Sequence, residues 1–392
     1  MINDVKVKTG LDILLGSPPV FRNKRLGLLC NPASTGPGLI HSRSLLQERF
    51  PDQLKALYSP QHGFFAEKQD NMIESGNRRD PVSGLPVFSL YGGTRIPTPE
   101  MLDLIDILII DLQDVGTRVY TFIYTIAYCM EAAKKSAKKV VVLDRPNPIG
   151  GRQMEGNCLN PEMSSFVGRF PIPMRHGLTI GELALFFNRY YKMACDLEVI
   201  PMSGWHRQMY YKDTGLDWIA PSPNMPTPVT AMVYPGQVLW EGTNVSEGRG
   251  TTQPFELFGA PYMDTDKLRH QFNDGKISGG ILRAVEFEPT SNKWTDQICK
   301  GFQIHVTDPD CFKPYETSLR LLQTVCRNHS SDFEWKPPPY EYEMQKMPID
   351  LIIGDKNIRK QLEDGMDVNI ICERWQDQLS DYISLAENIM LY

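Results

Sequence analysis

The chain of 392 residues has no long run of charge of one sign and no long apolar run. Its 41 Lys and Arg residues and its 47 Asp and Glu residues are interspersed, and the formal net charge is −6. We expect no nucleic-acid partner, because such a surface usually needs a basic stripe. We expect no membrane span either, because crossing a bilayer takes about 20 mostly apolar residues. Residues 1–6 lack the basic-then-apolar layout of a signal peptide. This predicts a cytoplasmic protein, or a periplasmic or secreted one if a signal sequence has been removed.

The spacings typical of metal and disulfide sites are also missing. The eight cysteines form no CxxC pair, and the seven histidines form no HExxH motif. We therefore expect reduced, mostly buried thiols and no bound metal ion.

The loop at residues 31–41 resembles a dinucleotide fingerprint but departs from it. Gly36 and Gly38 fit the first two glycine positions, whereas His41 stands at the third. Pro37 removes a backbone N–H that a phosphate would need. The loop therefore favours a Rossmann-like sheet without a nucleotide cofactor over a nucleotide-dependent enzyme.

Apolar, strand-like segments alternate with helical patterns in the first half of the chain. This alternation is typical of βαβ units and a parallel sheet. The strands are expected at 25–30, 54–58, 86–90, 107–110 and 140–143, and the helices at 42–50, from Thr98 and Pro99 onward, at 120–136 and at 179–191. The second half contains strand-like segments at 283–289 and 302–306 and a helical one at 312–329. Because the chain exceeds the usual size of one core, we expect a Rossmann-like parallel-sheet domain at residues 1–200 and a smaller α+β domain at residues 201–392.

Polar side chains follow three of the expected strands. Residues 59–63 (SPQHG), 111–118 (DLQDVGTR) and 144–148 (DRPNP) each come directly after an apolar run. In open parallel sheets, ligands bind outside the carboxyl ends of the strands, so these segments predict one polar pocket. A buried carboxylate needs a partner. Arg118 or Arg145 is therefore expected beside Asp111 and Asp114, and the alternative role of such a pair is purely structural.

A second polar segment lies at residues 240–252. It contains two glutamates, an asparagine and an arginine, beside the flat apolar faces of Trp240 and Tyr234. Sugar sites combine these two features, so the segment predicts a sugar-binding loop, with a glycine-rich connector as the alternative.

Five blocks of the sequence together resemble a known family. In order they are residues 59–63 (SPQHG), 111–116 (DLQDVG), 143–151 (LDRPNPIGG), 174–177 (MRHG) and 247–251 (EGRGT). They look like the NamZ-type exo-β-N-acetylmuramidases, peptidoglycan hexosaminidases long filed as a domain of unknown function. The resemblance covers nearly the whole chain. It implies a Rossmann-like N-terminal domain, a site in the cleft between two domains, and cofactor-free release of N-acetylmuramic acid from the non-reducing end of a glycan.

One position departs from the family pattern. The family's block usually reads S-P-E-H-G, whereas this chain has Gln61 in place of the glutamate. An amide cannot transfer a proton as a carboxyl group does. Either another carboxylate supplies the proton, or the protein is a non-catalytic binder of amino sugars or muropeptides. We expect Glu74 to be the replacement, since it matches a family position and lies in a polar segment that could cover the pocket.

Glycoside hydrolysis usually takes one carboxylic acid and one carboxylate. We predict Glu74 or Glu247 as the acid and Asp114 as the base, with substrate-assisted attack by the N-acetyl group as an alternative. An arginine fork is expected to bind the lactyl carboxylate of muramic acid, from Arg145, Arg175 or Arg249. The predicted substrate-binding residues are Gln61, His62, Asp111, Arg118, Asp144, Arg145, Asn147, Arg175, His176, Glu241, Asn244 and Arg249.

Overall fold

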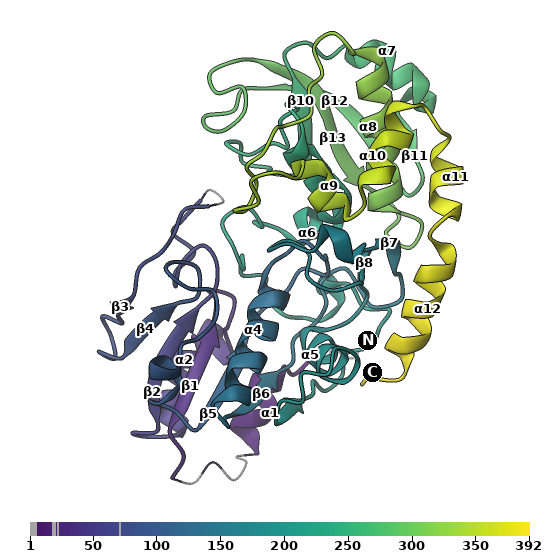
Figure 1. Cartoon of the computed structure of the whole chain (residues 1–392). Coiled ribbons are helices and arrows are strands. Elements are labelled where there is room, and N and C mark those ends of the chain that lie inside the picture. Colours follow the sequence, from purple (N-terminus) through teal and green to yellow (C-terminus); the bar gives the residue numbers. More distant parts are fainter. Residues whose placement is uncertain (1–5, 18–20, 22, 70–71) are drawn as a thin grey trace, which may run out of the picture.

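The computed structural model describes residues 6–17, 21, 23–69 and 72–392. Residues 1–5, part of the segment in which we found no signal-peptide layout, lie outside the described residues. Figure 1 shows a lower domain built on one sheet and an upper domain built on another, with the last helix running back down beside the lower domain. No helix in the described part of the chain has the length and apolar character needed to cross a bilayer.

The lower domain contains a seven-stranded sheet in the order β3-β4-β2-β1-β5-β6-β9. Its neighbours are parallel except for β3 and β4. The strands are β1 (Leu26–Cys30), β2 (Leu54–Ser59), β3 (Arg78–Arg79), β4 (Pro86–Ser89), β5 (Ile107–Asp111), β6 (Lys139–Leu143) and β9 (Leu197–Ile200). Taken in chain order, the parallel strands have the arrangement of dinucleotide-binding folds, so the Rossmann-like prediction is confirmed.

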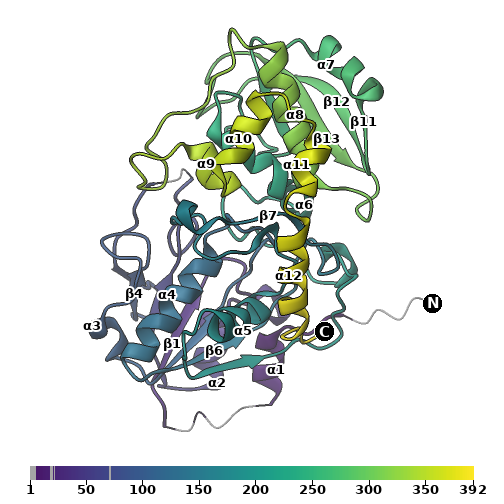
Figure 2. The ribbon, with the colours of Figure 1, turned by 45° about the vertical axis from the view of Figure 1, so that its right-hand side comes forward.

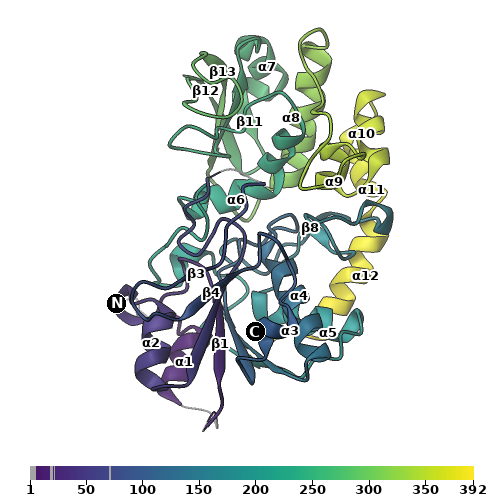
Figure 3. The same cartoon turned by 60° about the vertical axis from the view of Figure 1, so that its left-hand side comes forward.

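Helices cover both faces of this sheet, which is why its central strands read as continuous apolar runs. Every residue of β1 and β5 is buried. One face packs against α1 (Gly10–Gly16) and α2 (Ser42–Arg49), and the other against α3 (Pro99–Leu102), α4 (Phe122–Lys135) and α5 (Ile180–Tyr190) (Figure 3). Two predicted helix starts are confirmed: the Thr98 side chain accepts from the backbone N–H of Met101, and Thr179 forms a capping box with Glu182.

The upper domain contains an antiparallel sheet in the order β10-β13-β12-β11. Its strands are β10 (Leu257–Ala260), β11 (Lys276–Ile277), β12 (Gly280–Phe287) and β13 (Cys299–Val306), and the hairpin β7 (Glu155–Cys158) and β8 (Pro173–Arg175) lies below it. The remaining helices are α6 (Pro228–Gln237), α7 (Thr265–Gln271), α8 (Pro314–Asn328), α9 (Pro348–Ile353), α10 (Lys356–Glu363), α11 (Val368–Glu373) and α12 (Gln376–Glu387). Short 3-10 turns lie at Pro37–Leu39, Pro161–Met163, Tyr211–Asp213, Val238–Gly242 and Asn273–Gly275.

The predicted second-half strands and helix correspond to β12, β13 and α8, whereas the sequence reading missed α6 and the four C-terminal helices. Figure 2 shows α12 lying along the lower domain. Its Tyr382 hydroxyl donates to the carbonyl of His176 at 2.8 Å, and the Tyr392 hydroxyl donates to Oδ2 of Asp144 at 2.8 Å. The C-terminal segment therefore packs on the N-terminal domain.

The loop that follows β5 is tied to the upper domain by Arg118. We expected this guanidinium beside Asp114, and that expectation was wrong. Its side chain is fully buried and donates to four carbonyl oxygens. Two of them belong to the β7–β8 region, Asn157 at 2.7 Å and Ile172 at 3.1 Å. The other two belong to α9, Ile352 at 3.1 Å and Ile353 at 2.5 Å. The last two carbonyls close α9, where the helix dipole favours a cation. Arg118 therefore joins the two domains through backbone groups.

Replacing Arg118 should strongly destabilise the fold. Arg118→Met leaves buried carbonyl oxygens without a donor, and we expect the free energy of unfolding to fall by about 3 kcal/mol or more. The measurement is urea unfolding followed by tryptophan fluorescence. Arg320→Met is the matched control, because it breaks only surface contacts, with Glu316 and with Asn369, and should change little. Equal stability of the two variants would contradict the tethering role of Arg118.

Candidate active site

A pocket lined by residues of both domains lies between them. The N-terminal domain contributes the segment that follows β2 and the loop that leads into α4. The C-terminal half contributes α6, the 240–255 loop and the segment at 340–341. The polar lining is Gln61, His62, Thr121, Ser222, Asn224, Glu241, Arg249 and Glu341, and the aromatic lining is Tyr120, Phe122, Tyr234, Phe255 and Tyr340.

Gln61 stands at the carboxyl end of β2 and is buried. Its amide accepts from the Thr121 hydroxyl at 2.7 Å and donates to Oε1 of Glu341 at 3.2 Å. His62 adopts a left-handed backbone conformation, and its Nδ1 lies 2.8 Å from the carbonyl of Lys68. The position at which the family usually has a glutamate therefore faces a glutamate from the other domain.

Glu341 is the carboxyl group that the sequence reading missed. It is 4% exposed, and its Oε2 accepts from the Tyr91 hydroxyl at 2.7 Å. Burial raises the pKa of Glu341, and the negative charge of Glu241 raises it further, against the hydrogen bonds from Tyr91 and Gln61 that lower it. A buried carboxyl group of this kind can hold a proton for transfer to a substrate.

Cation–π contacts between Arg95 and three aromatic rings hold the segment that carries Glu341. The guanidinium of Arg95 lies 4.1 Å from the ring centre of Tyr342 and 4.9 Å from those of Tyr91 and Phe166. Glu341 and Tyr342 both have positive φ, which strains residues other than glycine. These cation–π contacts therefore stabilise a backbone conformation at residues 341–342 that is unfavourable by itself.

Glu241 occupies a contrasting environment in the same pocket. Its Oε1 pairs with Nη2 of Arg249 at 2.7 Å, and its Oε2 accepts from the Tyr340 hydroxyl at 2.6 Å. Arg249 also reaches Glu247 at 3.3 Å, and its Nη1 is buried without a hydrogen-bond partner. The pocket thus contains one ion-paired carboxylate and one carboxyl group that receives hydrogen bonds from neutral groups.

Glu247 lines an adjoining hollow of about 510 Å³, whose wall includes Glu241 and Arg249. Its Oε2 accepts from Nζ of Lys293 at 2.8 Å. Lys293 and Arg249 lower the pKa of Glu247 against the raising effect of burial. This environment favours a charged carboxylate rather than a proton donor.

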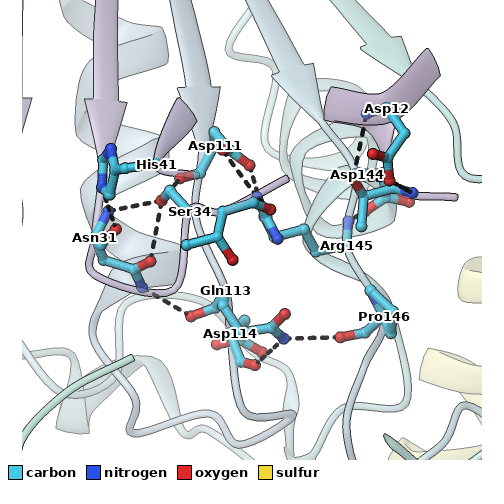
Figure 4. A network of polar contacts seen from close by, with 12 residues as sticks. Asp12, Asn31, Ser34, His41, Asp111, Gln113, Asp114, Asp144, Arg145 and Pro146 are labelled. Carbon is cyan, nitrogen blue, oxygen red and sulfur yellow. Dashed lines mark hydrogen bonds and ion pairs between the residues drawn. The ribbon is translucent and has the colours of Figure 1, made fainter. Parts of the chain in front are cut away.

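Polar contacts join the strand ends of β1, β5 and β6 to one another (Figure 4). Arg145 forms a two-point pair with Asp111, at 2.6 and 3.0 Å, and also donates to the carbonyl of Thr35 at 3.0 Å. The partner expected for Asp111 is therefore Arg145. Asn31 donates to the carbonyl of Gln113 at 3.2 Å in the same layer. These contacts join the strand ends to one another at the edge of the sheet where Rossmann folds bind nucleotides, and Arg145 also lines a hollow beside the 35–39 loop.

The other predicted residues on this side also hold the loops in place. Asp144 accepts from the Thr179 hydroxyl at 2.7 Å and from the Gly181 N–H at 2.7 Å. Burial raises the pKa of Asp144 to about 7 despite these hydrogen bonds. Asn147 donates to the carbonyl of Leu178 at 2.9 Å.

Asp114 pairs with His176 rather than with Arg118. Its Oδ2 lies 3.1 Å from Nε2 of His176 and accepts from the Gly116 N–H at 2.7 Å, while Oδ1 is buried without a hydrogen-bond partner. Arg175 donates to Gln153 and to the carbonyl of Ile149. None of these side chains is part of the described lining of the interdomain pocket.

Two further predicted residues lie outside the pocket lining. Glu74 is exposed, and its Oε1 accepts from the Tyr342 hydroxyl at 3.4 Å, so it touches the segment that carries Glu341. Asn244 donates to the carbonyl of Asp332 at 2.7 Å and accepts from the Tyr262 hydroxyl. Of the predicted residues, the structure therefore brings Gln61, His62, Glu241 and Arg249 together on one pocket, with Glu247 next to it.

Comparison with known proteins identifies the architecture. Models described as the N-terminal and C-terminal parts of the exo-beta-N-acetylmuramidase NamZ match residues 26–229 and 232–392. The chain belongs to the NamZ family. It is 43% identical over 388 residues to the peptidoglycan beta-N-acetylmuramidase NamZ of Bacillus subtilis strain 168, covering 99% of this chain and 92% of that protein.

Two solved structures from Bacteroides fragilis share the fold of this NamZ family member. Both are described as DUF1343 family proteins. One superposes with a TM-score of 0.88 at 34% identity and covers 99% of each chain. The other has a TM-score of 0.76 at 28% identity and covers 98% of this chain and 99% of its own.

We predict that neither NAD nor zinc stabilises the protein. In the loop after β1, Pro37 lacks the backbone N–H that a pyrophosphate would need, and His41 stands at the third glycine position of the fingerprint. Among the described residues, no group of three or more His, Cys, Asp and Glu side chains is arranged to hold a metal. The measurement is the melting temperature with and without NAD or zinc, with N-acetylmuramic acid as the positive control, since a ligand of the native state raises it. A rise of several degrees with NAD, or one with zinc that a chelator removes, would overturn the prediction.

Proposed function

We propose that this protein is a glycoside hydrolase that releases terminal N-acetylmuramic acid from the non-reducing end of peptidoglycan fragments. Membership of the NamZ family and the curated activity of the Bacillus subtilis relative support hydrolysis over non-catalytic sugar binding. The observation that carries the proposal for this chain is the presence of two buried carboxyl groups, Glu241 and Glu341, on one pocket despite Gln61.

Glu341 is the proposed general acid. Burial raises the pKa of Glu341, which favours the protonated form that a general acid needs, and its side chain lines the pocket. Gln61 takes part by holding Oε1 of Glu341 through its amide N–H. The loss of the family's glutamate is thereby offset by a carboxyl group from the opposite domain.

Glu241 is the proposed carboxylate that faces the anomeric carbon. Arg249 and Tyr340 hold it by charge and hydrogen bonding, so its negative charge can stabilise an oxocarbenium-like transition state. Asp114, Glu74 and Glu247, which the sequence assigned to catalysis, remain alternatives that the experiments below compare with Glu341.

Arg249 is the proposed ligand of the lactyl carboxylate. Of the three arginines that the sequence offered, Arg145 and Arg175 are engaged by groups of the lower domain, whereas Arg249 lines the pocket. Its buried Nη1 has no hydrogen-bond partner and can donate to an incoming carboxylate. A free lactyl carboxylate, without a peptide stem on that sugar, fits this donor best.

Removing the acid should abolish turnover. Glu341→Gln keeps the shape of the side chain but cannot deliver a proton. We expect kcat/KM for a chromogenic N-acetylmuramide to fall on the order of a hundredfold or more. Glu74→Gln and Glu247→Gln are the comparison variants. If Glu341→Gln is active while one of those two is dead, the acid lies there instead. Gln61→Glu should leave activity similar or raise it.

The pH profile should follow the pKa of Glu341. A general acid must be protonated, so kcat/KM should fall as the pH rises through the pKa of that carboxyl group in the free enzyme. Tyr91→Phe removes a hydrogen bond that lowers this pKa, and the fall should therefore move to higher pH. An unchanged or downward shift in Tyr91→Phe, with activity retained, would argue against Glu341 as the acid.

Arg249 should set the preference for muramic acid. Arg249→Gln is expected to reduce the ratio of kcat/KM for the chromogenic N-acetylmuramide to that for the N-acetylglucosaminide about tenfold or more, because a charged hydrogen bond is lost with one substrate only. The ratio cancels any general damage to Glu241. An unchanged ratio would assign the lactyl group to another residue.

A further inference from the structure

We propose that an open groove beside the pocket binds the sugars that follow the cleaved bond, so that the enzyme works on amino-sugar chains rather than on short fragments alone. This inference rests on the function proposed above. The groove is larger than the pocket. An enzyme that releases a terminal sugar binds that sugar in the pocket, so the leaving chain must continue outside it.

The groove is continuous with the pocket. Asn224 lines both hollows, and its amide donates to the carbonyl of Gln69 at 3.1 Å, which also lines the groove. The loop from Arg249 to Phe255 has both end residues on the pocket, whereas its residues 250–254 line the groove. A chain that leaves the pocket past Asn224 therefore enters the groove directly.

One wall of the groove is formed by residues 283–287 of β12. β12 pairs with β13 along its whole length, but β11 pairs only with Gly280 and Ile281. In the part of the chain that the structure describes, no strand covers the outer edge of residues 282–287, of which 283–287 line the groove. Each sugar of peptidoglycan carries an acetamido group. That group can pair with backbone N–H and C=O groups at such an edge as another peptide group would.

The remaining lining is suited to sugar hydroxyls. It combines the hydroxyl and amide side chains of Gln69, Asn224, Thr251, Thr252, Gln253, Thr290 and Ser291 with the charged side chains of Arg283, Glu286 and Glu288. The loop on this side is fixed, since the N–H and the hydroxyl of Thr290 both donate to the carbonyl of Gly250 at 2.9 Å. Hydroxyl and amide side chains both donate and accept, as the alternating hydroxyl and ether oxygens of a glycan require.

Blocking the groove tests the proposal. Ala284 is exposed on β12 and lines the groove, so Ala284→Glu should narrow it with a larger side chain and add a third carboxylate beside Glu286 and Glu288. We expect kcat/KM for peptide-free glycan chains of at least four sugars to fall about tenfold. Turnover of the chromogenic N-acetylmuramide, which has no glycan leaving chain, should stay unchanged. Ile281→Glu is the matched control, because it adds the same charge to the same strand at an exposed position outside the groove lining.

The outcomes separate this proposal from the proposed function. If the variant and wild type have the same ratio of chain to monosaccharide turnover, the groove proposal is wrong while the hydrolase proposal stands. If wild type turns over neither substrate, the hydrolase proposal fails. Calorimetric titration of the glycan chain then decides the groove: weaker binding by Ala284→Glu supports it, and equal binding overturns it. Displacement of the chain by a free stem peptide would show that the occupant is peptide and would also overturn it.

Discussion

The guanidinium of Arg118 is the contact on which the arrangement of the two domains depends. It is buried without a carboxylate partner, and its hydrogen bonds end on carbonyl groups of the β7–β8 region and of α9. Carbonyl oxygens accept hydrogen bonds in preferred directions. The contact therefore fixes the orientation of α9 relative to the loop after β5, as well as the distance between them. α9 begins at Pro348, shortly after the segment that carries Tyr340 and Glu341. Anchoring the end of α9 therefore also places this segment over the pocket.

The two pocket glutamates show how one fold can prepare carboxyl groups for different roles. Glu241 belongs to a row of alternating charges that continues through Arg249 and Glu247 to Lys293. Glu341 instead receives its hydrogen bonds from a phenol and an amide. Glycosidases place their two carboxyl groups in different environments, as we propose for Glu341 and Glu241. Because the row of charges lies in the upper domain and Tyr91 and Gln61 lie in the lower one, the difference between the two glutamates exists only when the domains meet.

The sequence predicted those features whose causes are local. Apolar runs located the parallel strands, and Thr98 and Thr179 located two helix starts through caps that span only three residues. The Gln61 end of β2 was also found, because strand ends follow from the same pattern. Glu341 could not be found in this way. Its partners, Tyr91 and Gln61, are 250 and 280 residues away along the chain. It follows a proline-rich stretch that reads as a linker, with no apolar run to mark it. The partner of Arg118 was predicted wrongly for a related reason. An aspartate nearby in the sequence predicts an ion pair, whereas every residue has a backbone carbonyl, so the sequence cannot show which carbonyls accept from Arg118.

The position of α12 has a mechanical consequence. The polypeptide passes from the lower domain to the upper one ahead of α6, and it returns between α11 and α12 to pack beside α5 (Figure 2). Two chain connections between the domains restrict their relative motion more than a single connection does. The domains can rotate about the line through both crossings, while twisting and sliding would stretch one of them. Any opening of the pocket is thereby reduced to a single degree of freedom, which returns Gln61 and Tyr91 of the lower domain to the same positions beside Glu341 on each closure.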